Sequence, residues 1–85
     1  MQNAFGVTGG AGFIGTNLCQ KLVLASHPVV IFDDLSRVGA EKNLRWLCEK
    51  YPQQVHFIRG DIAKDKEKLK EFVEHSDVIF HLAGQ

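Results

Sequence analysis

The densest chemical signal in the sequence is a run of glycines near its start. Residues 8–15 read Thr-Gly-Gly-Ala-Gly-Phe-Ile-Gly, which fits the spacing GxGxxG from Gly10 and the spacing GxxGxxG from Gly9. The run directly follows a predicted strand and opens a predicted helix, which is the setting in which this motif binds a dinucleotide. Glycine keeps the turn tight, lets the backbone approach a pyrophosphate and brings the helix close to the strand. The alternative is a purely structural glycine turn.

An acidic residue follows at the distance that a dinucleotide site requires. Asp33 ends the second predicted strand, 18 residues after Gly15, where a carboxylate accepts hydrogen bonds from the adenosine ribose hydroxyls. A carboxylate there repels a 2′-phosphate, so NAD is favoured over NADP, although Arg37 lies close by in the loop. The alternative for Asp33 is a solvated acid at a strand end, and Asp34 is interpreted as an ordinary loop acid.

Two more segments follow the later strands, at the same expected edge of the sheet. Asp61 and Ile62 come after the third strand, where an acid can accept from the exocyclic amine of an adenine and a backbone N–H can meet the ring. A helix N-cap is the alternative role for Asp61. Residues 81–84 follow the fourth strand, and His81 is interpreted as a packed histidine rather than a catalytic one.

The elements that must position these residues alternate along the chain. Strand-like runs cover residues 5–8, 29–32, 55–59 and 77–82, and helical stripes lie within 12–25, 44–51 and 69–73. The order βαβαβαβ predicts an α/β fold, namely a Rossmann-type parallel sheet with strand order 3-2-1-4, as an incomplete doubly wound fold. The first two helices are expected on one face and the third on the other. The fourth strand is expected as an apolar edge, open to self-association.

The composition excludes several classes of protein. The 85 residues carry ten Lys+Arg, ten Asp+Glu and 45% hydrophobic residues, as in an ordinary globular unit. The balanced charge argues against nucleic acid and membrane surfaces as partners, and no stretch reaches the ~18 apolar residues of a membrane span. The cytoplasm is the expected location. Cys19 and Cys48 are predicted to be reduced and packed, and the scattered histidines indicate neither a metal site nor a catalytic triad.

Four motifs, in this order, resemble those of the extended short-chain dehydrogenase/reductase family, which contains nucleotide-sugar epimerases and dehydratases. They are the glycine motif at 8–15, Asp-Asp-Leu-Ser at 33–36, Gly-Asp-Ile at 60–62 and His-Leu-Ala-Gly at 81–84. Residues 32–47 and 81–85 are similar, more narrowly, to the CDP-paratose 2-epimerases, also called CDP-tyvelose epimerases. Two residues depart from the family pattern: Gly6 replaces a large aliphatic residue and is expected to weaken the first strand, and Asp34 replaces a common Asn.

The resemblance implies a bound NAD that takes a hydride from a sugar carbon and returns it to the opposite face. It also implies which residues contact the pyrophosphate, the ribose, the adenine and the nicotinamide side of NAD. In that order, these are Gly9, Gly12, Phe13, Ile14 and Gly15; Asp33; Asp61 and Ile62; and Leu82, Ala83 and Gly84.

The catalytic residues of that family have no counterpart in this sequence. Catalysis there rests on a Ser/Thr and a Tyr-x-x-x-Lys pair, whereas the single tyrosine, Tyr51, is followed four residues later by Val55. We therefore expect residues 1–85 to be the NAD-binding amino-terminal portion of an epimerase, inactive alone, which meets a nucleotide sugar only when the other half is supplied. The alternatives are a stand-alone dinucleotide-binding module, part of a nucleotide-sugar 4-epimerase or 4,6-dehydratase, and a scaffold without a cofactor.

Overall fold

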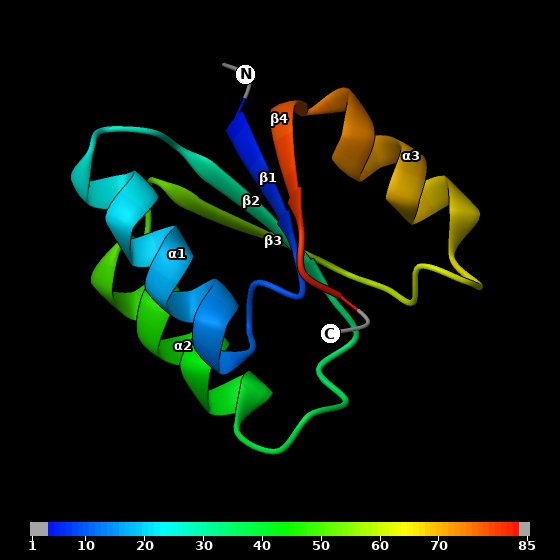
Figure 1. Ribbon diagram of the computed structural model, residues 1–85, viewed down its shortest axis with the longest axis horizontal. Coiled ribbons are helices and arrows are strands. Elements are labelled where there is room, and N and C mark those ends of the chain that lie inside the picture. The colour runs from blue at the N-terminus through cyan, green and yellow to red at the C-terminus, as the bar shows by residue number, and fades with distance from the viewer. Residues whose placement is uncertain (1–3, 84–85) are drawn as a thin grey trace.

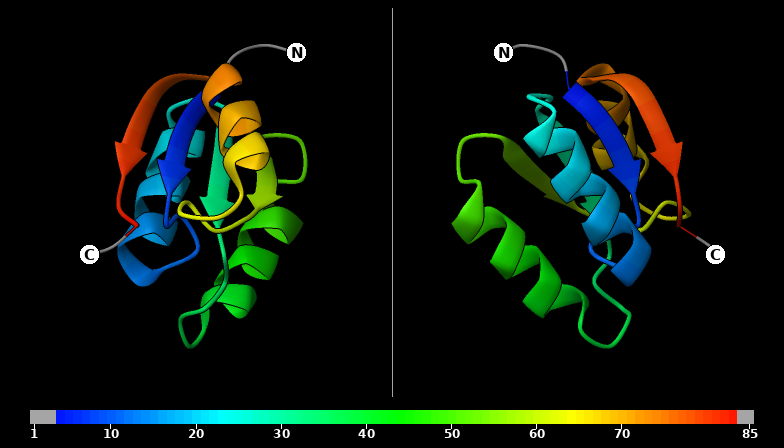
Figure 2. Two further views of the ribbon diagram at one scale, coloured as in Figure 1. Left: turned by 90° about the vertical axis from the view of Figure 1, so that its right-hand side faces the viewer. Right: turned by 60° about the vertical axis from the view of Figure 1, so that its left-hand side comes forward.

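Four parallel strands form one sheet in the order β3-β2-β1-β4. The computed structural model describes residues 4–83. The strands are β1 (Ala4–Thr8), β2 (Val29–Asp33), β3 (Val55–Arg59) and β4 (Ser76–His81), and the helices are α1 (Phe13–Leu24), α2 (Ala40–Lys50) and α3 (Lys66–Glu74). Helices α1 and α2 lie on one face of the sheet and α3 on the other (Figure 1). Figure 2 shows the same layers from two more sides. The predicted α/β fold, strand order and placement of the helices are confirmed.

Strand β2 is buried on both faces because it lies between two separate cores. Val29 and Ile31 pack with residues of α1 and α2, whereas Val30 and Phe32 pack with Phe72 of α3. These four apolar side chains of β2 are at most 2% exposed. This explains why the strand is an unbroken apolar run instead of an alternating one.

Helix α1 packs on the sheet through only part of its predicted apolar stripe, since Cys19 and Val23 are buried and Leu18 and Leu22 pack against them. Its buried residues are Gly15, Cys19 and Val23. Ile14 is 69% exposed, and Ala25 follows the last helical residue. Two of the apolar residues at helical spacing within 12–25, Ile14 and Ala25, therefore do not face the core. Gly15 of the helix lies directly against the β1–α1 turn. With Gly15 facing the turn, the side chain of the neighbouring Ile14 points away from the core.

The other two helices follow their predicted stripes more closely. Helix α2 buries Leu44 and Leu47, as its periodicity predicts. Helix α3 buries Phe72 completely, whereas Val73 is 48% exposed. One aromatic side chain therefore provides most of the contact between α3 and the sheet.

Strand β4 is an edge strand, and it begins and ends one residue earlier than the predicted range 77–82. It pairs with β1 on one side. Val78 and Ile79, which point to opposite faces, are 46% and 41% exposed. Among residues 4–83, no further strand pairs with the outer side of β4.

Gly6 has a packing role that its weak strand propensity conceals. It pairs in register with Val30 of β2 and Ile79 of β4. A Cβ atom at Gly6 would lie 2.7 Å from the Cζ atom of Phe72 and would overlap the hydroxyl of Ser76. Glycine therefore allows the chain to pass from α3 into β4 directly against β1.

Within the described part of the chain, no helix has the length and hydropathy needed to cross a membrane.

Candidate cofactor-binding site

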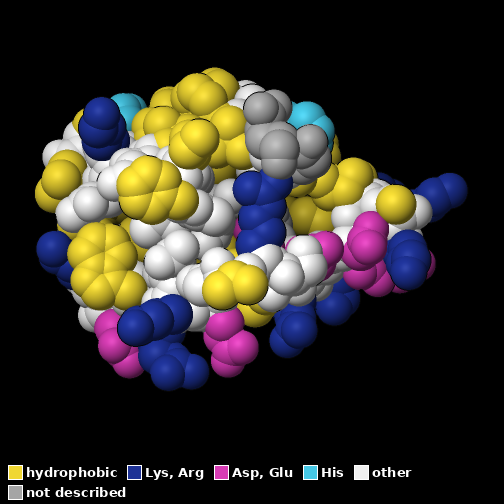
Figure 3. All heavy atoms as spheres, turned by 60° about the horizontal axis from the view of Figure 1, so that its bottom comes forward, with side chains coloured by type: hydrophobic (Ala, Val, Ile, Leu, Met, Phe, Trp, Pro, Cys, Tyr) yellow, Lys and Arg dark blue, Asp and Glu magenta, His cyan; other side chains and the backbone are white. Residues whose placement is uncertain are grey.

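A cleft of about 720 Å³ lies at the carboxyl ends of the strands. This volume is in the range of cofactor and ligand sites. The cleft brings together every described residue that the sequence motifs suggested, namely Gly9, Gly12, Phe13, Ile14, Gly15, Asp33, Asp61, Ile62, Leu82 and Ala83. Gly84 lies outside the described residues. Figure 3 views this end of the molecule, where hydrophobic side chains lie beside acidic and basic ones.

The glycines of the β1–α1 turn differ in whether the fold itself requires a residue without a side chain. Gly9 has φ +74°, and a Cβ there would lie 2.9 Å from the backbone nitrogen of Ala83. A Cβ at Gly15 would lie 2.7 Å from the Cα of Gly10. At Gly12, in contrast, a Cβ would meet only the carbonyl oxygen of Gly9, at an ordinary 3.4 Å. The fold does not require glycine at position 12, but a side chain there would enter the cleft.

The start of α1 is suited to an anion. Gly12 is its N-cap residue and offers no side-chain cap, and the first turn contains no acidic residue. The first N–H groups of a helix have no partner within the helix and carry a partial positive charge. These groups lie at the cleft, where they fit the charge of a pyrophosphate.

Asp33 is held in place by backbone groups from two loops. Its Oδ2 atom accepts a hydrogen bond from the N–H of Ala11 at 3.1 Å, and its Oδ1 atom accepts one from the N–H of Leu35 at 2.7 Å. The alternative of a solvated acid at a strand end is therefore wrong. A carboxylate can accept about four hydrogen bonds, so Asp33 keeps capacity for the hydroxyls of a ribose.

The loop after β2 adds three more residues to the cleft wall, Asp34, Ser36 and Arg37. Hydrogen bonds from the side chain and backbone N–H of Ser36 hold the pKa of Asp34 below its usual value. The backbone bond joins the Ser36 nitrogen to Oδ1 of Asp34 at 3.0 Å. Asp34 is an exposed acid of the loop, as expected, and it places a second negative charge beside Asp33.

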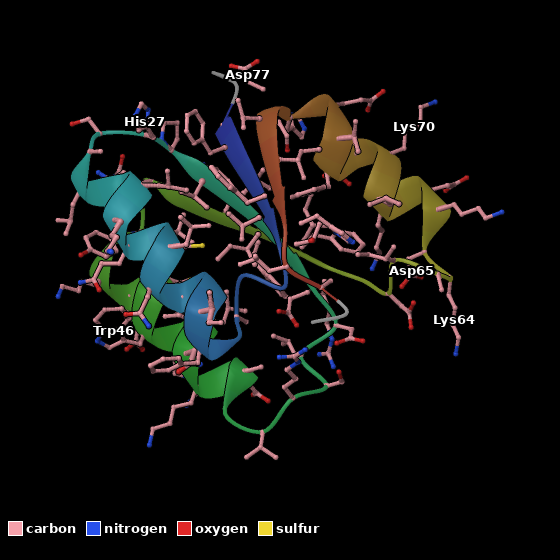
Figure 4. The ribbon with its side chains drawn as sticks, viewed as in Figure 1. His27, Trp46, Lys64, Asp65, Lys70 and Asp77 are labelled. Atoms are coloured by element: carbon pink, nitrogen blue, oxygen red, sulfur yellow. The ribbon has the colours of Figure 1, made fainter. Side chains whose placement is uncertain are left out.

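Asp61 organises the turn after β3 and does not cap a helix. Its Oδ1 atom accepts a hydrogen bond from the N–H of Ala63 at 2.7 Å. Its own N–H donates to Oδ2 of Asp65 at 2.7 Å, and Asp65, not Asp61, is the residue before α3 (Figure 4). The N-cap alternative for Asp61 is wrong, and its carboxylate lies on the cleft wall.

At the end of β4, the histidine is bonded to a buried threonine of β1. The hydroxyl oxygen of Thr8 accepts the N–H groups of Leu82 and Ala83 at 3.1 and 3.3 Å. The same oxygen is hydrogen-bonded to Nδ1 of His81 at 2.7 Å. The side chain of His81 is exposed on the cleft wall, so the prediction of a packed histidine is wrong.

The remaining reactive side chains lie outside this cleft. His27 stacks on Phe5 with ring centroids 4.5 Å apart, at the opposite end of the strands (Figure 4). Burial raises the pKa of the Cys19 thiol to about 12, and the free Cys48 is half-buried, as expected for reduced, packed cysteines. Residues 4–83 contain no group of three or more His, Cys, Asp or Glu side chains that could hold a metal ion.

Sequence reasoning missed two side chains that support the cleft from outside. Asn43 of α2 donates from Nδ2 to the carbonyl of Ala11 at 2.9 Å, and Asp65 holds the N–H of Asp61. Neither residue lines the cleft. The spacing of Asn43 from the motifs gives no signal, because its partner lies 32 residues earlier in the chain. The contact of Asp65 is local, since it spans only four residues.

Comparison with known proteins identifies relatives that are similar to almost the whole of this chain. CDP-paratose 2-epimerase of Salmonella typhi is 38% identical over 80 residues, which cover 93% of this chain and 23% of that protein. UDP-N-acetyl-alpha-D-glucosaminuronate decarboxylase of Bacillus cytotoxicus is 40% identical over 78 residues, which cover 92% of this chain and 22% of that protein. The chain thus spans less than a quarter of the length of these relatives.

A solved structure supports the same relationship. The crystal structure of UDP-glucuronic acid 4-epimerase from Bacillus cereus, in complex with UDP-glucuronic acid and NAD, has a TM-score of 0.75 and 32% sequence identity. The match covers 92% of this chain and 25% of that one. The sequence profile of the NAD-dependent epimerase/dehydratase family matches residues 6–85. Because this match includes almost the whole sequence, the chain belongs to the NAD-dependent epimerase/dehydratase family.

Proposed function

We propose that this chain binds NAD and is the amino-terminal, NAD-binding portion of a nucleotide-sugar epimerase. The observation that carries the proposal is the single cleft on which three chemically different features converge. These are the uncapped start of α1 at Gly12, the carboxylate of Asp33, and the turn at Asp61 and Ile62. Each matches one part of NAD, respectively the pyrophosphate, the adenosine ribose and the adenine.

The residues of this chain would bind and orient NAD. The N–H groups at the start of α1, within residues 12–15, would meet the pyrophosphate, and Gly9 would let the backbone pass close to it. The remaining acceptor capacity of Asp33 would take the ribose hydroxyls, and Leu82, Ala83 and Gly84 would pass the nicotinamide side. NAD, when bound, supplies the hydride acceptor for transient oxidation of a sugar. The acids Asp33 and Asp34 disfavour the 2′-phosphate of NADP.

The substrate class rests on the relatives. The Salmonella typhi relative acts on CDP-paratose, and the similarity of residues 32–47 favours the same substrate with inversion at C2. The Bacillus cytotoxicus decarboxylase and the Bacillus cereus 4-epimerase, at comparable identity, favour a second candidate, another NAD-dependent enzyme of UDP-linked sugars. In either case we propose a cytoplasmic enzyme whose nucleotide sugar binds to the portion of the protein beyond these residues.

We also propose that residues 1–85 bind NAD but do not turn over a sugar alone. The Tyr-x-x-x-Lys pattern does not occur in them, since Val55 stands four residues after Tyr51. A stand-alone dinucleotide-binding module remains the alternative, and its activity assay would give the same result. The exposed β4 edge, with Val78 and Ile79, would then favour self-association. Sedimentation of the wild type and of Ile79→Lys tests this, because a lysine on the edge should abolish a dimer.

The decisive experiment is a thermal melt with and without NAD. A ligand that binds only the folded chain stabilises it by about 2.7 kcal/mol at 100 times its Kd, so the midpoint should rise. The matched control is Gly12→Asp. The backbone of Gly12 is extended (φ −73°, ψ 175°), so it can accept a side chain. Because aspartate is a favourable N-cap residue, this variant should fold well.

The two proteins should respond differently to NAD. In Gly12→Asp, a carboxylate would occupy the place of the pyrophosphate, so the midpoint without NAD should stay or rise while the NAD response disappears. A cooperative melt of the wild type that does not shift with NAD would contradict the proposal and favour a scaffold without a cofactor. An equal NAD response in both proteins would move the pyrophosphate away from α1.

A further inference from the structure

Side chains from two other elements bond to the backbone of Ala11. Ala11 is completely buried in the β1–α1 turn. Its N–H donates to Oδ2 of Asp33 at 3.1 Å, and its carbonyl accepts from Nδ2 of Asn43 at 2.9 Å. The turn also has backbone bonds from Gly9 to Phe32 and from Gly12 to Gly9. Asp33 bonds to the Gly10–Ala11 peptide, whose N–H is that of Ala11. The carbonyl of Ala11 and the N–H of Gly12 belong to the next peptide unit, so Gly9 and Asn43 together set the orientation of the Ala11–Gly12 peptide.

Asn43 is well placed to hold this peptide. Its backbone N–H donates to the carbonyl of Gly39 at 2.9 Å, which anchors it in the first turn of α2. The next residue, Leu44, is buried in the core, so the helix has little freedom to rotate. A neutral amide can donate to the Ala11 carbonyl without adding a charge near the cleft, whereas an aspartate of the same shape would face that carbonyl with an oxygen.

The position of Ala11 determines where the anion-binding groups point. Ala11 precedes Gly12, the N-cap of α1, and the N–H groups that follow lie at the cleft. A rotation of the Ala11–Gly12 peptide would turn these groups away from a bound pyrophosphate. We propose that Asn43, which does not line the cleft, is a positioning residue for the pyrophosphate site. The inference rests on the proposed NAD function and deepens it.

The test compares ligands with and without a pyrophosphate. Asn43→Leu removes the donor at similar volume, and loss of one hydrogen bond predicts about a tenfold loss of affinity for NAD and for ADP-ribose. Affinity for adenosine, which has no pyrophosphate, should change less than about twofold. Asn43→Asp keeps the shape but replaces the donor by an oxygen, so its loss for NAD should be larger. A merely structural role would lower the melting midpoint without separating ADP-ribose from adenosine.

The matched control is a second asparagine that makes the same kind of bond inside one helix. Asn17 donates from Nδ2 to the carbonyl of Phe13 at 2.9 Å and is exposed. Asn17→Leu should leave the affinities for NAD and ADP-ribose within about twofold of wild type. Equal losses for ADP-ribose and adenosine in Asn43→Leu, or equal losses in the two Leu variants, would overturn the inference.

A measurement on the unliganded wild type separates this inference from the proposed NAD function and does not depend on the variants folding. NMR should detect scalar coupling across the bond from Nδ2 of Asn43 to the carbonyl carbon of Ala11, and slow exchange of that side-chain proton. Absence of both signals overturns the positioning role. If both are present but the wild type binds neither NAD nor ADP-ribose, the proposed function fails together with the role that rests on it, and only the contact itself stands.

Discussion

The carboxylate of Asp33 is bonded to the glycine turn, since its Oδ2 atom accepts the N–H of Ala11 at 3.1 Å. This hydrogen bond joins the end of β2 to the turn after β1. The second oxygen holds the N–H of Leu35, whose φ of 61° lies in the left-handed region. Asp33 therefore shapes both loops of the cleft, in addition to the ribose contact proposed for it.

Replacing Asp33 by alanine should weaken NAD binding more than NADP binding. Loss of hydrogen bonds to a charged group costs about 1.5–3 kcal/mol, which corresponds to about a 10- to 100-fold loss for NAD. The loss for NADP should be smaller because the same change removes a charge that repels the 2′-phosphate. Titration of Asp33→Ala with both cofactors measures the difference. Equal losses would assign to Asp33 only the bracing of the two loops.

Alanine at Gly15 should lower the stability of the fold, whereas alanine at Gly12 should lower the affinity for NAD. At Gly15 the new methyl group would lie 2.7 Å from the Cα of Gly10, so α1 would have to move and the free energy of unfolding should fall by about 1–3 kcal/mol. At Gly12 it would meet only the Gly9 carbonyl at 3.4 Å, so stability should be maintained while NAD affinity falls. Urea unfolding and NAD titration of both variants separate the two roles. A stable Gly15→Ala protein would show that the turn yields easily.

The topology was predictable because its signals are local. The apolar run 29–32 indicates a strand buried on both faces, and alternation of strands with helices leaves a parallel sheet with right-handed crossovers. The site followed from the rule that ligands bind at the carboxyl ends of such strands. Gly9 and Asp33 could thus be assigned to one edge from sequence alone.

The parts that were missed depend on contacts between distant segments or on glycines. Periodicity counts apolar side chains, so it could not show that α1 meets the turn through Gly15 and turns Ile14 outward. The bond from Asp65 to the N–H of Asp61 spans only four residues. The bond from Asn43, in contrast, joins its side chain to the carbonyl of Ala11, 32 residues earlier in the chain, and neither the type nor the spacing of Asn43 indicates that partner. Such contacts become visible only when the segments are placed in space.

Gly6 should tolerate a side chain only if Phe72 becomes smaller. Gly6→Ala would place a methyl group 2.7 Å from the Cζ of Phe72, and overpacking of this kind costs about 1–3 kcal/mol. Phe72→Leu alone should also destabilise, because it removes part of a buried ring. In the double variant, part of the first loss should be recovered, and a double-mutant cycle of urea unfolding measures this coupling. Strictly additive losses would place the strain elsewhere, for example at the Ser76 hydroxyl.

The stability of the protein should fall above pH 9, in part because of Cys19. Burial raises the pKa of this thiol from its ordinary value of 9.0 to about 12. Between these values the unfolded chain loses the thiol proton while the folded chain keeps it, so unfolding becomes more favourable as the pH rises. The contribution of Cys19 is fully present below pH 9 and should decrease by about 1.4 kcal/mol per pH unit above it.

The matched variant is Cys19→Ala, because every other titratable side chain is the same in both proteins. Urea unfolding at pH 8 and pH 10.5 should show a steeper loss in the wild type, by about 2 kcal/mol over that interval. The half-buried Cys48, whose pKa is also raised by burial, should add a smaller slope of the same sign to both proteins. Parallel losses in wild type and Cys19→Ala would mean that water reaches the Cys19 thiol in the folded chain. Cys19 is completely buried where α1 packs on the sheet through Gly15, Cys19 and Val23. Parallel losses would therefore mean that this packing opens to water in solution.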